Sequence, residues 1–173
     1  PAIQPVLWEL PRRLFAPCDK AAYRDWLTAP VERYEGDGVD DMPGLAYPIR
    51  HWEIANEPAM QGGHGYFFQG TSADYLELLA TSASIIRTAD PEALVLTGGQ
   101  AGMQPEFTDF WRPVLLEAGG SFDIGNIHSI GSDASFFSAP YRAFLDSTGH
   151  ADIPYWVTEA LLPTMTAPGQ RAP

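Results

Sequence analysis

The stretch "HWEIANEPAM", residues 51–60, is a short apolar run that stops at Asn56, Glu57 and Pro58. A run of this composition is typical of a buried strand, and proline lacks the N–H group that a central strand needs. We therefore expect a strand over residues 50–56 whose end presents an amide and a carboxylate. What these two polar groups do depends on the elements that the chain places around them.

The chain beyond this stretch repeats one structural unit. Apolar runs rich in Ile, Val, Leu or aromatic residues predict further strands over residues 93–97, 122–128 and 153–158. Amphipathic stretches between the strands predict helices over residues 71–89, 106–118 and 138–149. Thr71 and Asp74 stand at capping-box spacing where the first of these helices begins. The alternation of strands and helices predicts an α/β fold with a parallel sheet.

The segment before residue 50 is less regular. It predicts a strand over residues 3–7, a helix over residues 19–34 and a loop over residues 35–48 that is rich in glycine, proline and acidic residues. The acidic positions of this loop faintly resemble a calcium loop, but the defined pattern with a closing glutamate is absent. The histidines also lack metal-ligand spacing, so we expect no metal site and no cofactor.

The composition argues against certain partners. Hydrophobic residues make up 45% of the chain and charged residues 18%, which is typical of a folded globular domain. A formal charge of -12, with only 10 Lys and Arg residues, makes nucleic acid and anionic membranes poor partners. No apolar run approaches the ~20 residues of a membrane span, and Cys18 has no second cysteine with which to form a disulfide. A neutral or weakly charged ligand fits this composition best.

Two carboxylates follow strands of the predicted sheet. Glu57 closes the first strand, and Glu159, in the sequence "YWVTEA" of residues 155–160, closes the last. The carboxyl ends of parallel strands meet at one rim of the sheet, so these two side chains can face each other. Cleavage of a glycosidic bond needs such a pair of carboxyl groups. Taken alone, Asn-Glu-Pro is also an ordinary polar turn at the end of a strand.

A family resemblance joins these two motifs. "WEIANEP", residues 52–58, and "WVTEA", residues 156–160, resemble the strand-four and strand-seven signatures of the clan A glycoside hydrolases, which include β-xylosidases, cellulases, mannanases and β-galactosidases. Residues 32–58 most resemble the branch of the family 39 β-xylosidases and their iduronidase relatives. The resemblance implies that residues 1–173 are a single, incomplete catalytic domain, a partial (β/α)8 TIM barrel of about strands three to seven.

The resemblance also implies roles for named residues. Glu57 corresponds to the general acid/base and Glu159 to the nucleophile of a retaining enzyme, and Asn56 to a donor for the sugar 2-hydroxyl. His128 falls where clan members often keep a histidine near the nucleophile. Many members have an aromatic residue two positions after that histidine, whereas this chain has Ile130, which weakens the correspondence of His128.

Other residues near the expected rim have less specific patterns. Tyr66 lies on the loop after Glu57 and could provide a flat surface for a sugar ring, although covering the end of the barrel is the alternative role. Glu53 shares strand parity with Glu57, so we expect it inside the barrel, in a structural role and beside a positive charge such as an arginine. Trp156 has the opposite parity to Glu159 and is therefore expected between strand and helices.

The resemblance thus implies a retaining glycosidase that cleaves a β-linked carbohydrate substrate by double displacement. Two alternatives stay open, a non-catalytic carbohydrate-binding relative and a structural α/β fragment. A complete barrel takes about 250 residues, whereas this chain has 173, so the isolated piece could hold both carboxylates and still be inactive. Enzymes of this kind are often exported, which favours an extracellular or periplasmic location, and the sequence leaves the oligomeric state open.

Overall fold

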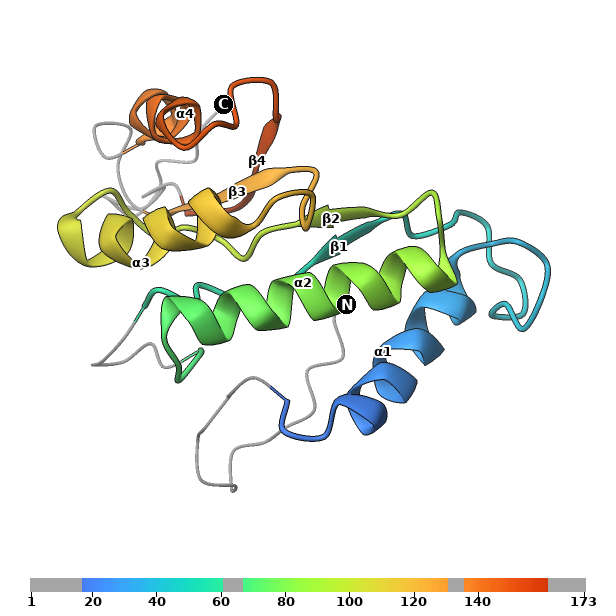
Figure 1. Ribbon diagram of the computed structural model, residues 1–173. Coiled ribbons are helices and arrows are strands. Elements are labelled where there is room, and N and C mark those ends of the chain that lie inside the picture. Colours follow the sequence, from blue (N-terminus) through green and yellow to red (C-terminus); the bar gives the residue numbers. More distant parts are fainter. Residues whose placement is uncertain (1–16, 61–66, 131–135, 162–173) are drawn as a thin grey trace, which may run out of the picture.

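The computed structural model describes residues 17–60, 67–130 and 136–161. Helices and strands alternate along this part of the chain (Figure 1), in the order α1 (Lys20–Tyr34), β1 (His51–Glu53), α2 (Ser72–Ala89), β2 (Leu94–Leu96), α3 (Pro105–Glu117), β3 (Gly125–Ile130), α4 (Ser138–Ser147) and β4 (Tyr155–Leu161). Every helix and strand predicted within these ranges is present. The strand predicted over residues 3–7 lies outside the described residues.

All pairings between the strands are parallel. β1 pairs with β2, and β3 pairs with β4. Two single bridges, Leu96 with Ile124 and Gln100 with Ile127, join the β2 side to the β3 side, also in parallel. The strands therefore follow one another in space in the same order as in the sequence. The prediction of an α/β fold with parallel strands is confirmed, and the carboxyl ends of β1 and β4 point the same way.

The helices cover the strands and close the core. α2 runs alongside β1 and β2, and α1 packs against α2 (Figure 1), where the hydroxyls of Tyr23 and Ser82 share a hydrogen bond. The predicted capping box is present, because Thr71 accepts from the Asp74 N–H and Asp74 accepts from the Thr71 N–H. The buried apolar residues form one cluster, and its largest members include Tyr75, Leu79, Ile86, Trp111, Ile127 and Leu145.

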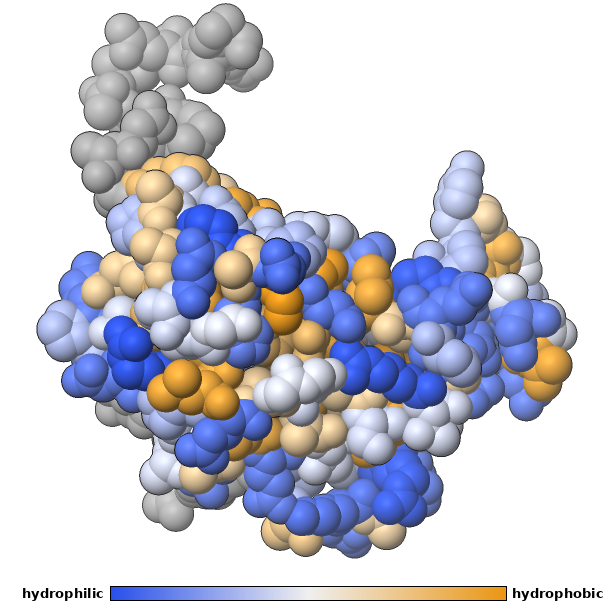
Figure 2. All heavy atoms as spheres, turned by 45° about the horizontal axis from the view of Figure 1, so that its top comes forward, coloured by the Kyte–Doolittle hydropathy of each residue, from blue (hydrophilic) through white to orange (hydrophobic). Residues whose placement is uncertain are grey.

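The surface is mixed in polarity. Hydrophilic and hydrophobic residues intermingle on the face that Figure 2 shows. In the loop over residues 35–48, Asp41 accepts hydrogen bonds from the N–H groups of Gly36 and Gly38, and Asp37 accepts from that of Val39. The acidic side chains of this loop thus hold its own backbone. Within the described part of the chain, no helix combines the length and the apolar character needed to cross a membrane.

One acidic residue of this region is buried. Glu35 follows the last turn of α1 and is only 4% exposed. Burial raises the pKa of Glu35, and the negative charges of Asp37 and Glu32 raise it further, to about 7. A raised pKa in the folded state means that the protonated form contributes stability below the ordinary pKa of about 4.5, and that this contribution is lost as the pH rises through about 7.

We therefore expect the stability of the protein to fall as the pH rises from about 5 to 8. Replacing Glu35 by glutamine, which is neutral at every pH, should flatten this dependence. Denaturant midpoints measured across this pH range test the expectation. Glu117→Gln, a change of the same kind at an exposed position of α3, is the matched control. A Glu35→Gln variant with the wild-type pH dependence would contradict the assignment.

Candidate active site

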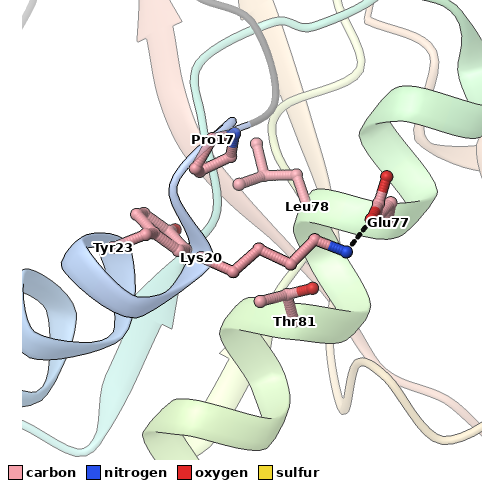
Figure 3. Close-up of a pocket in the computed structure, with 6 residues that line it drawn as sticks. All are labelled: Pro17, Lys20, Tyr23, Glu77, Leu78 and Thr81. Carbon is pink, nitrogen blue, oxygen red and sulfur yellow. Dashed lines mark hydrogen bonds and ion pairs between the residues drawn. The ribbon is translucent and has the colours of Figure 1, made fainter.

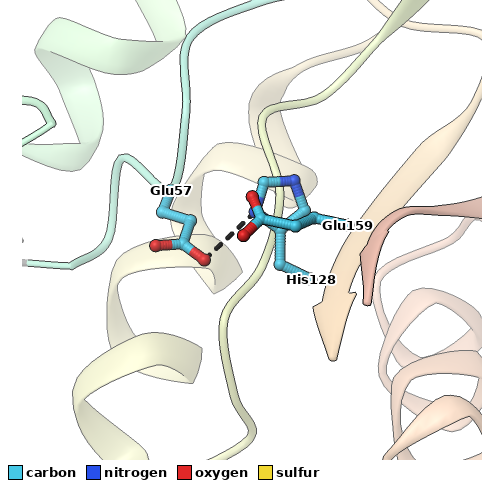
Figure 4. A group of neighbouring side chains, drawn as sticks. All are labelled: Glu57, His128 and Glu159. Carbon is cyan, nitrogen blue, oxygen red and sulfur yellow. Dashed lines mark hydrogen bonds and ion pairs between the residues drawn. The ribbon is translucent and has the colours of Figure 1, made fainter. Parts of the chain in front are cut away.

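Three of the predicted site residues come together in the structure. Glu57, His128 and Glu159 lie side by side (Figure 4), and one ligand atom from each lies within 4.8 Å of the others. Nδ1 of His128 is 3.1 Å from Oε1 of Glu57 and 3.4 Å from Oε2 of Glu159. A single ring nitrogen therefore faces both carboxylates, which come from residues far apart in the sequence.

The backbone after β1 aims Glu57 at this point. Ala55 has a φ of 65° and Glu57 a φ of 38°, so the chain leaves the extended conformation here, earlier than the strand predicted over residues 50–56. The hydroxyl of Tyr75 holds the turn, because it donates to the carbonyl of Ile54 and accepts from the N–H of Gly98. Glu57 is 4% exposed and is thus held in place by buried structure.

Two glycines after β2 allow the segment before Glu57 and the ring of His128 to pack closely against the backbone. A Cβ on Gly98 would lie 2.8 Å from the Ile54 carbonyl oxygen and 2.9 Å from that of Ala55. A Cβ on Gly99 would lie 2.2 Å from both Cδ2 and Nε2 of His128. Real side chains cannot occupy such space, so the buried His128 ring packs directly on the backbone at Gly99.

A bulge in β4 positions Glu159. His128 pairs with Glu159 and Ile127 with Val157, so Thr158 has no partner opposite it and the register shifts at this step. A bulge of this kind turns two successive side chains toward the same side of a sheet. Both Thr158 and Glu159 accordingly contact His128, through Oγ1 of Thr158 to Nε2 at 3.1 Å and through Oε2 of Glu159 to Nδ1.

The bulge also overturns the predicted place of Trp156. We expected this side chain between strand and helices, but its ring contacts the ring of His51 on β1, with 4.6 Å between ring centres, and it is 42% exposed. Trp156 pairs with Asn126, which shares the parity of His128, so it lies on the His128 side of the strands. The parity argument was wrong because it counted alternation through a strand that contains an extra residue.

Glu53 contacts the second ring nitrogen of His128. Its Oε1 is 3.3 Å from Nε2, and the side chain is 28% exposed. Glu53 thus faces the same side as His128, and the partner beside it, which we expected to be a positive charge such as an arginine, is the imidazole of His128. Strand parity predicted the direction of Glu53 but not its partner, because Glu53 lies on β1 and His128 on β3, with β2 between them.

Asn126 and Thr158 complete the hydrogen bonding around His128, and the sequence patterns did not single out either of them. The N–H group and the hydroxyl of Thr158 both approach Oδ1 of Asn126, at 3.3 Å and 2.9 Å. Asn126 is fully buried two residues before His128. Its position at the same strand parity as His128 is the signal that could have identified it.

The charge of His128 depends on its carboxylate neighbours. Burial alone lowers the pKa of His128, but hydrogen bonds to Glu53 and Glu57 and the negative charges of both carboxylates outweigh burial and raise it. A histidine and two carboxylates at this spacing also satisfy the distance requirement of a metal site. The hydrogen bond between His128 and Glu57 accounts for the approach of these two side chains.

The other two residues predicted to bind substrate are Asn56 and Tyr66. Asn56 is half-buried beside Glu57, and its contact with a sugar hydroxyl stays a prediction. Tyr66 lies outside the described residues.

A small hollow between α1 and α2 (Figure 3) is lined by Pro17, Lys20, Tyr23, Glu77, Leu78 and Thr81. Its volume of about 10 Å³ admits about one water molecule, so it is too small for a sugar and is separate from the carboxylate cluster.

Solved structures share this arrangement of helices and strands. No protein-family model matches the sequence, and a comparison with curated proteins finds no match. The structure resembles that of a glucosidase from Croceicoccus marinus, with a TM-score of 0.68 and 19% identity over 94% of this chain and 34% of that one. It also resembles a GH39 β-xylosidase from Caulobacter crescentus, with a TM-score of 0.57 and 22% identity over 87% of this chain and 33% of that one.

A third solved structure also resembles that of this chain. It is a family 51 α-L-arabinofuranosidase from Bifidobacterium longum, with a TM-score of 0.59 and 18% identity over 89% of this chain and 36% of that one. This chain thus spans about a third of the length of these three proteins. At such low identity the likeness concerns the fold. It confirms, at that level, the resemblance to clan A glycosidases that the two sequence motifs indicated.

Proposed function

We propose that the protein is a retaining glycoside hydrolase that cleaves a β-linked glycoside by double displacement. In this proposal Glu57 is the general acid/base and Glu159 the nucleophile, and the chain forms about strands three to seven of a (β/α)8 barrel. The observation that carries the proposal is the meeting of the Glu57 and Glu159 carboxylates at one nitrogen of His128, at the carboxyl ends of parallel strands.

The two carboxyl groups differ in the way that this reaction needs. The Glu57 side chain is 5% exposed and the Glu159 side chain 50% exposed. A buried carboxyl within hydrogen-bond distance of an imidazole can exchange a proton with it, which suits a group that protonates the leaving group, and an accessible carboxylate is suited to attack a substrate. The same residue types in two environments would thus take the two different roles.

The reaction proceeds in two steps under this proposal. An oxygen of Glu159 attacks the anomeric carbon while Glu57 donates its proton to the glycosidic oxygen, so that the bond to the leaving group breaks. Glu57, now a carboxylate, then takes a proton from water, whose oxygen attacks the anomeric carbon and releases Glu159. One oxygen of Glu57 lies within 4.8 Å of one oxygen of Glu159, which is nearer to the separation of about 5–5.5 Å between the carboxyl groups of retaining enzymes than to the about 6.5–9.5 Å of inverting enzymes.

The substrate would be a neutral sugar. The chain carries a formal charge of -12, which disfavours a negatively charged ligand. Three solved proteins of similar fold are named as a glucosidase, a β-xylosidase and an arabinofuranosidase. Asn56, next to the acid/base, would donate a hydrogen bond to the 2-hydroxyl, and Tyr66 would offer a surface for the ring.

Hydrolysis of aryl β-glycosides tests this function. We expect the complete barrel to turn over at least one member of a panel of aryl β-xyloside, β-glucoside and β-galactoside. Proton NMR of the first product should show the anomer of the substrate, because two inversions restore the configuration. The opposite anomer would contradict double displacement. Binding of the sugars without hydrolysis of any of them would favour the non-catalytic alternative.

Gly99 provides a test that changes no side chain of the proposed catalytic machinery. In a Gly99→Ala variant the new methyl group would occupy the space of the His128 ring, so the ring must move away from Glu57 and Glu159. A displacement of this size should lower kcat/KM by about 100-fold and destabilise the fold by about 1–3 kcal/mol. Steady-state kinetics and denaturant unfolding measure the two effects.

Gly120→Ala is the matched control for this change. Gly120 lies between α3 and β3, and a Cβ there meets no atom within 4 Å. The control variant should keep wild-type activity and stability. If Gly99→Ala also hydrolysed glycosides at the wild-type rate, the position of the His128 ring would not matter for the reaction.

A further inference from the structure

The hydrogen bonds around Nε2 of His128 determine where its hydrogens lie. The backbone N–H of Thr158 donates to Oδ1 of Asn126, which fixes the oxygen side of that amide toward Thr158. The hydroxyl of Thr158 must then donate its own hydrogen to the same oxygen, 2.9 Å away. Toward Nε2 of His128, 3.1 Å away, the hydroxyl oxygen can only accept. Nε2 therefore carries a hydrogen.

Glu53 strengthens this assignment from the other side. Its Oε1 lies 3.3 Å from the same Nε2, and an ionised carboxylate has only acceptors to offer. The Nε2–H group thus points between a hydroxyl oxygen and a carboxylate. These contacts of Thr158 and Glu53 are made with Nε2, and not with Nδ1 or Glu57. They therefore favour the Nε2–H tautomer of His128 independently of Glu57.

With a hydrogen on Nε2, one further proton on the His128–Glu57 pair can lie in two places. Either the imidazole is charged and Nδ1–H donates to Oε1 of Glu57, or it is neutral and a protonated Glu57 donates to Nδ1. The two states contain the same number of protons. They differ by the transfer of one proton along a single hydrogen bond of 3.1 Å between Nδ1 and Oε1.

We propose that Glu53 is a positioning residue that keeps His128 in the Nε2–H form, so that Nδ1 of His128 and Glu57 share the one proton that is delivered to the leaving group. The second half of this proposal rests on the proposed function, and the first half does not. Glu53 acts through His128 and makes no contact with the reacting atoms in this scheme.

The charges that face His128 decide how the shared proton responds to pH. Glu53 faces it from β1, Glu57 from the segment after β1, and Glu159 from β4. The segment after β2 presents Gly99, and Asn126 of β3 and Thr158 are uncharged. Among the described residues the ionisable groups in contact with the ring are thus carboxylates. The carboxylates of Glu53 and Glu159 favour retention of the proton on the His128–Glu57 pair, and Glu53, which contacts Nε2, does so without competing for that proton.

NMR of the imidazole nitrogens tests the positioning role directly. In protein labelled with nitrogen-15 at histidine, we expect the neutral form of His128 to carry its hydrogen on Nε2. In Glu53→Gln, which keeps an acceptor but loses the charge, the pair should release its proton about one pH unit lower than in the wild type. Glu77→Gln, an exposed position on α2 away from the cluster, is the matched control and should leave the titration unchanged.

Thr158→Val provides a second variant of nearly equal volume. It removes the other acceptor of Nε2–H, so Glu53 alone must hold the tautomer, and we expect the Nε2–H form to persist. A hydrogen on Nδ1 in neutral wild-type His128 would overturn the proposal. An unchanged titration in a folded Glu53→Gln variant would overturn it too.

The pH dependence of hydrolysis tests the second half. The alkaline limb of kcat/KM should move about one pH unit lower in Glu53→Gln, in step with the NMR titration. A lower rate with an unmoved limb would show that Glu53 is merely structural. If the NMR titration shifts but no variant hydrolyses any glycoside, the proposed function fails while the assignment of His128 stands.

Discussion

Replacing Glu159 by glutamine should abolish hydrolysis of β-glycosides and lower kcat/KM by about 10⁴-fold or more. The amide has nearly the volume of the carboxylate, but it lacks the charge that attacks the anomeric carbon. Because Glu159 is half-exposed and its backbone is fixed by pairing with β3, the variant should fold normally. Steady-state kinetics with an aryl β-glycoside measure the loss, and thermal unfolding verifies the fold.

A trapping experiment makes this prediction specific to the nucleophile. A 2-deoxy-2-fluoro β-glycoside with a good leaving group slows the release of the glycosyl-enzyme, so the adduct should be found by peptide mass spectrometry on Glu159. The Glu159→Gln variant should show no adduct, whereas Glu77→Gln should be labelled like the wild type. A Glu159→Gln variant within tenfold of wild-type activity, or a label on another residue, would contradict the assignment.

The helices and strands were predictable because each has a local, repeating pattern of apolar residues. The strands around Trp52, Val95 and Ile127 are apolar runs, and the helix that contains Leu79 and Ile86 has a clear apolar stripe and a capping box. The meeting of Glu57 with Glu159 was predictable as well, since it follows from parallel strands that end at one rim. These inferences need the pattern of residue types and no knowledge of packing.

The features that were missed depend on departures from the regular alternation of side chains along a strand. The positive φ angles at Ala55 and Glu57 shorten β1, and neither alanine nor glutamate is a residue type that signals such a backbone. The bulge at Thr158 shifts the parity of the residues before Glu159, which is why Trp156 was placed on the wrong side. The partner of Glu53 was missed because an inward carboxylate can be paired by any cation that the fold brings near it, and here that group is His128.

Replacing Glu57 should affect substrates according to their leaving groups. A general acid contributes about 10²–10⁴-fold where the leaving group needs a proton, so Glu57→Ala should lose about this factor on a disaccharide or an alkyl β-glycoside. A dinitrophenyl β-glycoside leaves without protonation, and the first step on it should be nearly as fast as in the wild type. The glycosyl-enzyme should then accumulate, because the same variant lacks the base that activates water.

This accumulation gives the prediction its sharpest measurement. With a dinitrophenyl substrate, Glu57→Ala should release a burst of one phenolate per enzyme and then turn over slowly. A small anion such as azide needs no base, so it should raise the slow rate and yield a β-glycosyl azide, whereas Glu159→Ala, which makes no glycosyl-enzyme, should not form that product. Equal losses on all leaving groups, with no burst and no effect of azide, would mean that Glu57 does not move the proton. Its buried contact with His128 would then only stabilise the fold.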